Sequence, residues 1–350
     1  MTTAQLRAEA RGSGPGGSQL QDRNDESLPP SGEQGLPAGA SLYAAFLCIL
    51  FGANAVAIKF SLAGLGMYTN AGLRFIVASI AVLLWARFTG RTLAISWVRI
   101  RQLIPLGIIF SAQLAFFYAG LIKTTASHCT LISNLLPFVV MVLAHFFIPG
   151  DRISLKKTSG LVLGFAGVLV LLSDSVMLSG DILAGDMLVL LAVLVWGCNA
   201  VYSKRIIKDF QPFQITLYPM LMSVPFFVSG MLLFDDPMVR HVDTPVIASM
   251  LYQTFVTASF GMVAWSSMIK KYGATAVHSF VFIMPVSGVF FGIVLLDEPL
   301  TINLVASIVL VTAGLVVLNR KRRKIAVVAI EQPIRSDKEQ SSFPNHGGEV

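Results

Sequence analysis

Three polar residues lie inside long apolar segments of the sequence: Arg74, Asn54 and Asn199. An arginine in an apolar helix is costly unless it faces water, a partner group or a bound ligand. One interpretation of Arg74 is therefore contact with an anionic group such as a carboxylate. The other is structural, because Arg74 lies six residues into its segment and its side chain can reach the nearby end or bind backbone carbonyls. The sequence leaves both interpretations open.

The two asparagines belong to a stretch that occurs twice. Residues 51–59 read FGANAVAIK and residues 196–204 read WGCNAVYSK. Each asparagine is suited to bind a ligand or to hydrogen-bond a neighbouring helix, and the sequence does not choose between these roles. Lys59 and Lys204, which close the two stretches, are typical of side chains that anchor a helix at the membrane surface. A role of Lys59 in guiding anions is the alternative.

Further polar and aromatic side chains lie in similar segments. Cavities for small amphipathic ligands combine aromatic walls with a few polar groups that orient the ligand. For each residue alone, packing is the simpler explanation, whereas the group as a whole favours a cavity. Besides Arg74 and the two asparagines, the candidates are Gln113, Tyr118, Asn134, Tyr202, Tyr252, Trp265 and His278.

Histidine, aspartate and glutamate side chains within the apolar segments could bind and release a proton. Histidine titrates near neutral pH, and His128, His145 and His278 lie in or beside apolar segments, with His278 the preferred candidate. No Asp or Glu is expected in the middle of a segment, where a buried carboxylate could bind a proton. One hypothesis is that the function is coupled to a proton, which binds to a histidine or to an acid near a segment end, such as Asp186 or Glu298. The other is that no proton is coupled.

The composition places these residues in a membrane. Of 350 residues, 55% are hydrophobic and 13% are charged, with a mean hydropathy of +0.72, whereas soluble domains are about a quarter charged. The formal net charge of +7 is typical of basic cytoplasmic loops rather than of nucleic-acid binding. The three cysteines have no metal-binding or disulfide spacing, so we expect no metal and no cofactor.

Ten segments approach the length of about 20 apolar residues that crosses a bilayer. They are 42–62, 68–87, 103–122, 126–148, 158–174, 184–204, 212–234, 246–269, 275–296 and 303–319. If the N-terminus is cytoplasmic, Lys and Arg gather on the inner links, and Asp and Glu gather on the outer links. We therefore expect an all-α, multi-pass membrane protein with both termini in the cytoplasm.

The segments divide into two halves, 42–174 and 184–320, with five spans each. Because five is odd, the second half enters the membrane upside down relative to the first. Such inverted five-helix repeats are frequent in transporters, where the substrate site lies near the midplane between the halves. The flanking stretches 1–41 and 325–350 are polar and are predicted to be disordered cytoplasmic tails.

Prolines and glycines recur in the two halves. Pro137 and Pro285 lie inside the fourth span of each half, where a proline removes a backbone hydrogen bond and tends to kink the helix. Gly160, Gly164 and Gly167 are spaced for close helix contact. Packing inside the chain is the favoured explanation of this spacing, and a homodimer is the alternative.

These motifs together resemble the drug/metabolite transporter superfamily, specifically its ten-span EamA-type permeases. The resemblance covers about residues 42–320 and rests on the aromatic-Gly-x-Asn turns, Arg74, the two prolines and the sequence EPLT at 298–301. It implies a bacterial inner-membrane permease, most often an exporter of amino acids, metabolites or drugs. It also implies a central cavity lined by spans one, three, four, six, eight and nine. The chain departs from the family pattern at Asp151 and Arg152, where the family often has Glu.

The expected function is a secondary transporter that exports a small metabolite, amino acid or drug by alternating access. An uptake permease is the first alternative, because topology does not assign a direction. A membrane-embedded enzyme or a sensor is a remote alternative, since the sequence has no HExxH, GxSxG or GxGD motif and its links are short. The expected partners are a small-molecule substrate and the lipid bilayer, with no nucleic acid.

Overall fold

The computed structural model describes residues 36–91, 93–148, 154–207 and 210–319. Ten stretches of helix in these ranges are long and apolar enough to cross a membrane, which is the number predicted. The first helix begins at Ala38, so residues 38–41 are helical rather than part of a tail. The remainder of the two predicted tails, except Leu36 and Pro37, lies outside the described residues.

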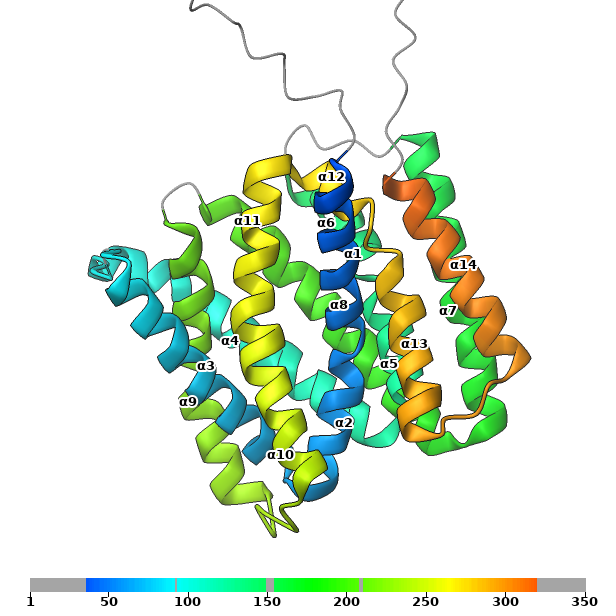
Figure 1. The fold of residues 1–350 in the computed structure, drawn as a ribbon, viewed down its shortest axis with the longest axis horizontal. Helices are drawn as coiled ribbons and strands as arrows, with labels where there is room; N and C mark the ends of the chain where they lie inside the picture. The colour runs from blue at the N-terminus through cyan, green and yellow to red at the C-terminus, as the bar shows by residue number, and fades with distance from the viewer. Residues whose placement is uncertain (1–35, 92, 149–153, 208–209, 320–350) are drawn as a thin grey trace, which may run out of the picture. The chain divides into compact units, whose positions relative to one another are not determined.

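The first half of the chain supplies spans one to five (Figure 1). Span one consists of α1 and α2, span four consists of α5 and α6, and the other three spans are single helices. The bounds are α1 Ala38–Gly52, α2 Asn54–Gly64, α3 Met67–Phe88, α4 Trp97–Lys123, α5 Ala126–Ser133, α6 Leu136–Phe147 and α7 Leu155–Leu178.

The second half supplies spans six to ten. Span eight is α10, a π-helix and α11, and span nine is α12 and α13. The bounds are α8 Gly180–Ile206, α9 Pro212–Phe234, α10 Thr244–Leu251, the π-helix Tyr252–Gly261, α11 Met262–Tyr272, α12 Ala274–His278, α13 Ile283–Leu296 and α14 Ile302–Asn319.

The two halves enter the bundle from opposite faces. In Figure 1, α1 begins at the face where α14 ends, which we call the terminal face. Five spans later, α8 begins at the other face, which we call the distal face and which carries the links after Gly64, Lys123, Leu178, Phe234 and Leu296. The ten-span architecture with an inverted second half is therefore as predicted.

Three spans are interrupted, spans one and four near their middles and span nine after one short helix. Span one breaks at Ala53, span four at Asn134 and Leu135, and span nine at residues 279–282. Pro137 and Pro285 follow the second and third breaks directly and lie in the first turn of α6 and of α13. A proline is tolerated there because the first N–H groups of a helix have no partner within the helix. The two prolines thus begin new helices instead of kinking continuous ones.

The glycine of each repeated stretch packs against the fourth span of the opposite half. A Cβ on Gly52 would lie 2.8 Å from the carbonyl oxygen of Met284 in α13. A Cβ on Gly197 would lie 2.5 Å from Cγ1 of Val139 in α6. The two close crossings are inverted mates, but α8 continues through Gly197 while α1 ends at Gly52. The two copies therefore share their packing and differ in their backbone.

Spans five and ten pack against each other at one side of the bundle (Figure 1). A Cβ on Gly314 would lie 2.8 Å from the carbonyl oxygen of Gly160 and 2.8 Å from the amide nitrogen of Gly164. Gly164 also faces Phe138, and Gly167 faces α14. The glycine stripe of span five therefore packs inside the chain, as the sequence favoured.

Gly314→Leu should destabilise the bundle, because its side chain would overlap the backbone of α7. Overpacking of this kind costs about 1–3 kcal/mol. The matched control is Gly39→Leu, since nothing lies within 4 Å of a Cβ at that position. The measurement is the thermal unfolding midpoint of the detergent-purified protein, which should fall for Gly314→Leu only. Equal midpoints for the two variants would contradict the close α7–α14 crossing.

Candidate functional site

A cavity of about 580 Å³ lies between the two halves of the chain. Its walls come from spans one to four of the first half and from spans six to nine of the second half. Spans five and ten, which pair with each other, contribute no lining residue. The cavity therefore includes spans two and seven in addition to the six spans that the family resemblance implied, and these two spans are inverted mates.

The structure brings most of the predicted site residues together. The residues that line the cavity are Asn54, Arg74, Gln113, Tyr118, Asn134, Asn199, Trp265 and His278, and Pro137 lies beside them. Pro285 is buried in α13 outside the wall.

Tyr202 and Tyr252 lie outside the cavity wall, which corrects their prediction as lining residues. The Tyr202 hydroxyl donates to the carbonyl oxygen of Gln102 at 2.9 Å, and the Tyr252 hydroxyl donates to that of Leu50 at 2.7 Å. A phenol in an apolar helix needs a hydrogen-bond acceptor, and the backbone of an adjacent helix supplies one. Both tyrosines therefore tie neighbouring spans together.

Arg74 on α3 is 9% exposed and points into the cavity, so it does not reach for the membrane surface. Its guanidinium donates at 3.4 Å to Tyr118, Gln253 and Asn54, and at 3.5 Å to Thr257. All four acceptors are neutral, and all four distances are long. No carboxylate among the described residues forms an ion pair with Arg74. The cavity therefore holds a positive charge without a matching negative charge.

A buried hydrogen-bond network positions one of these acceptors. Gln253, in the π-helix, donates to Ser61 at 2.8 Å and to Asn70 at 3.1 Å, and Asn70 donates to Ser61 at 2.6 Å. All three residues have no exposed surface. Sequence reasoning missed Ser61, Asn70 and Thr257, because small polar side chains are common between membrane helices and give no signal alone.

Three atoms of the cavity residues have no hydrogen-bond partner in the described part of the chain: Nε of Arg74, Oε1 of Gln113 and Nδ2 of Asn199. An unpaired buried polar atom costs about 1–3 kcal/mol, so a ligand that pairs with it gains affinity. Two of the atoms are on donor groups, and one is an acceptor. The cavity can therefore bind an anionic group together with a hydrogen-bond donor such as an ammonium.

Aromatic rings form much of the remaining wall. Phe51 and Trp265 meet edge to face with ring centroids 5.8 Å apart, and Trp265 lies 5.6 Å from the ring of His278. Phe75 meets Phe110 at 5.4 Å in the same manner. These rings supply an apolar surface beside the polar groups, which suits a small amphipathic ligand.

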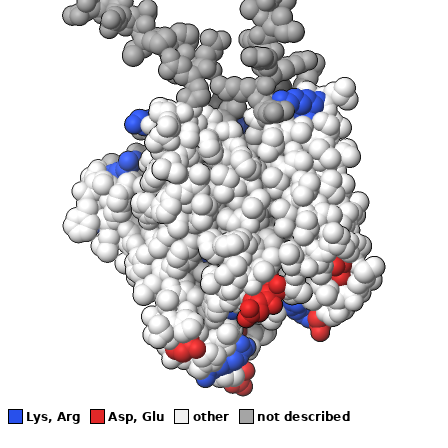
Figure 2. Space-filling model, turned by 45° about the vertical axis from the view of Figure 1, so that its right-hand side comes forward, with Lys and Arg blue, Asp and Glu red and all other residues white. Residues whose placement is uncertain are grey.

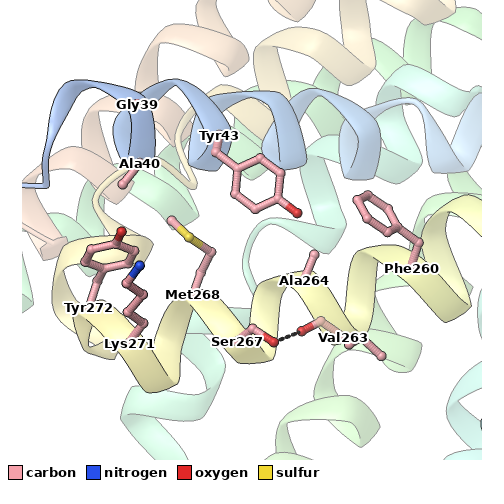
Figure 3. Close-up of a pocket in the computed structure, with 10 residues that line it drawn as sticks. All are labelled: Gly39, Ala40, Tyr43, Phe260, Val263, Ala264, Ser267, Met268, Lys271 and Tyr272. Atoms are coloured by element: carbon pink, nitrogen blue, oxygen red, sulfur yellow. Dashed lines mark hydrogen bonds between the residues drawn. The ribbon is translucent and has the colours of Figure 1, made fainter. Parts of the chain in front are cut away.

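A second hollow lies on the outside of the bundle between α1 and α11 (Figure 3). Tyr43 and Phe260 face each other across it, and Lys271 lies near the end of α11. The hydroxyl of Ser267 is used within the helix, since it donates to the carbonyl oxygen of Val263 at 2.7 Å. This hollow has few polar groups that converge on one point, so the central cavity is the better candidate for recognising a metabolite.

Comparison with known proteins gives the same assignment for both halves. Residues 39–173 and 183–320 each match the model of the EamA-like transporter family. Two proteins named "Probable amino-acid metabolite efflux pump" are similar to this chain: one from Escherichia coli is 29% identical and one from Salmonella typhimurium is 28% identical. Each alignment covers 78% of this chain and 92% of the relative.

Two further similarities concern the general class of protein and the fold. A protein of Archaeoglobus fulgidus named "Uncharacterized transporter" is 26% identical over 76% of this chain and 93% of its own length. A solved crystal structure superposes with a TM-score of 0.58 at 19% identity, covering 80% of this chain and 98% of that chain. The superposition shows the fold alone.

The cavity should be accessible to water-soluble reagents. In a background without the native Cys48, Cys129 and Cys198, we expect Asn199→Cys to react with a small polar thiol reagent. Val193→Cys is the matched control, because Val193 lies on the same helix and has no exposed surface. Equal labelling rates for the two variants would contradict a hydrated cavity at Asn199.

Proposed function

Because the chain belongs to the EamA-like transporter family, we propose that it is a secondary transporter that exports a small anionic or zwitterionic metabolite by alternating access. The observation that carries the proposal is Arg74, a buried cation in the cavity whose described partners are all neutral. A substrate carboxylate would supply the missing charge through a charge-assisted hydrogen bond.

An amino acid is the substrate class that uses most of the cavity's features. Its carboxylate suits Arg74, its ammonium suits the unpaired Oε1 of Gln113, and an apolar side chain suits the ring of Trp265. The names of the relatives from Escherichia coli and Salmonella typhimurium add support to amino-acid export. The cavity and the names of the relatives together support amino acids as the substrate class.

The charge distribution supports a cytoplasmic terminal face in an inner membrane. In Figure 2, acidic side chains gather at the lower end of the molecule, whereas Lys and Arg also occur at the upper end. Basic residues next to the terminal-face ends of spans include Arg87, Arg99, Arg101, Arg205 and Lys271. Basic links remain in the cytoplasm during insertion. We accordingly propose that both termini are cytoplasmic, with residues 1–37 and 325–350 as tails.

The extent of the cavity supports a state that opens towards the terminal face. Ser203 and Thr216 line the cavity close to the terminal-face ends of α8 and α9. At the distal face the two halves, proposed as 42–174 and 184–320, are tied to each other. Asp235 accepts from the Thr69 amide at 2.6 Å, and Arg240 donates to the carbonyl oxygen of Leu62 at 3.1 Å. Export would break these ties and form equivalent contacts at the terminal face.

The glycine stripe of span five gives no support to a homodimer, because its close contacts lie within the chain. The cavity is lined by both halves of one chain. The proposed transport unit is therefore a single chain, and a dimer is not required for it.

Arg74→Gln should weaken amino-acid binding by about tenfold to a hundredfold, since a hydrogen bond to a charged group contributes about 1.5–3 kcal/mol. The measurement is counterflow of radiolabelled amino acids, tested as a panel, in liposomes containing the purified protein. Arg99→Gln, at an exposed position in the first turn of α4, is the matched control. Unchanged counterflow in Arg74→Gln would remove Arg74 from the binding site.

The direction of transport can be read from growth. Cells that overexpress the protein should tolerate a toxic amino-acid analogue better than cells that express Arg74→Gln, because export lowers the internal concentration. Membrane abundance of both forms is measured in parallel. Increased sensitivity on overexpression would contradict export and would favour an uptake permease.

A further inference from the structure

A buried cluster of titratable side chains lies apart from the cavity, near the distal face. His128 on α5 is 2% exposed, and its Nδ1 lies 2.9 Å from Oδ2 of Asp186 on α8, which has no exposed surface. Ser175 on α7 and Thr124 at the end of α4 both donate their hydroxyl protons to Asp186. None of the four residues lines the cavity. Asp186 thus lies near a segment end, as the sequence indicated, and the neighbouring spans bury it completely.

A second carboxylate lies on the other side of the same imidazole. Oδ2 of Asp174 is 3.8 Å from Nε2 of His128, and Asp174 is 4% exposed. Asp174 accepts from the Thr301 hydroxyl at 2.5 Å and faces the Asn303 amide at 3.4 Å. The imidazole thus has a carboxylate near each ring nitrogen.

The charged groups around the cluster do not neutralise it. Lys59 on α2 donates its ammonium protons to the backbone carbonyls of Leu121 and Thr124. Glu298 accepts from the first backbone N–H groups of α5. Lys123 on α4 pairs with Asp181 on α8 at 3.6 Å, where Asp181 is largely exposed. Among the described residues, no Lys or Arg forms an ion pair with Asp174 or Asp186.

This arrangement favours a proton on the imidazole. Two carboxylates and a neutral ring would leave two buried negative charges, which is costly. A neutral imidazole has one N–H and can donate to one carboxylate only, whereas the protonated ring has two donors. The protonated ring can therefore donate to Asp186 at 2.9 Å and place its second N–H towards Asp174, whose Oδ2 lies 3.8 Å away.

The cluster also joins the two halves. His128, Thr124, Ser175 and Asp174 belong to the first half, and Asp186, Thr301 and Asn303 belong to the second half. Their contacts lie at the distal face, together with those of Glu298 and Asp235. Opening the distal face would separate the halves there and break these contacts.

We propose that His128, Asp186 and Asp174 form a proton-binding site whose occupancy stabilises the state with a closed distal face, so that substrate export is coupled to proton entry. The inference rests on the proposed function for its coupling step. A proton from water at the open distal face binds the imidazole, and the distal face closes around the protonated ring. The proton is then released on the side of the terminal face. Substrate binding drives the return, and no other reactant is consumed.

The first measurement needs no substrate. The ring nitrogens of histidine-labelled full-length protein in lipid nanodiscs are followed by NMR across about pH 5 to 8, where histidine charge changes occur. The His128 signal is assigned by its loss in His128→Gln. We expect this ring to gain and lose a proton across the range and its profile to change in Asp186→Asn. A ring that stays neutral throughout would overturn the proton site.

The second measurement tests coupling in liposomes with the amino acid that gives the fastest counterflow. His128→Gln and Asp186→Asn should reduce accumulation driven by a pH gradient by about tenfold, in line with typical coupling energies, and should retain counterflow at equal pH. Retained counterflow shows that the variants fold. Asp181→Asn, in the exposed pair with Lys123, is the matched control and should behave as the unaltered protein does.

The outcomes separate the two proposals. Gradient-driven accumulation that survives in both variants overturns coupling through this cluster. An unaltered protein that shows no counterflow with any amino acid overturns the proposed substrate class, and the ring titration then decides the proton site by itself.

Discussion

A backbone N–H or C=O in the hydrocarbon core of a membrane has no water to bind, so a helix can break there only beside protein groups or a water-filled cavity. The three interrupted spans obey this constraint. Residues next to each break line the cavity: Gly52 and Asn54 in span one, Asn134 in span four, and His278 in span nine. At one break the side-chain amide of Asn134 donates to the carbonyl oxygen of Thr130 at 2.8 Å, and the backbone N–H of Asn134 donates to the same oxygen at 3.1 Å. The breaks place polar backbone and side chains where a ligand can reach them.

Much of the fold follows from the sequence because apolar length and loop charge are strong signals. The ten spans and their inversion were predictable in this way, whereas the sequence left Arg74 open between a ligand contact and a structural role. The direction of individual side chains was not, as Tyr202 and Tyr252 show. In a membrane helix the lipid-facing and protein-facing sides are both apolar, so the periodicity that orients a soluble helix is weak. Which face a tyrosine presents then depends on partners far away in the chain.

Asp186 and His128 illustrate the same limit. Both lie within the first seven residues of their helices, so the sequence places them near a membrane surface. Their burial results from the packing of α4, α5, α7 and α8 around one carboxylate. The contact between them spans 58 residues of sequence. The central cavity therefore lies where helices break, whereas the cluster of His128 and Asp186 lies where the ends of several helices meet.

The unequal backbones of the two repeated stretches have an energetic consequence. If the halves were identical, a two-fold rotation about an axis in the membrane plane would turn the form open to one face into the form open to the other, and the two would have equal free energies. Here α1 ends at Gly52 while α8 continues through Gly197, so exchanging the roles of the halves does not regenerate the same structure. The protein without substrate must then favour one of two forms, the form open to the terminal face or the form open to the distal face. Of the two conformational changes in a transport cycle, one therefore raises this conformational free energy and the other lowers it.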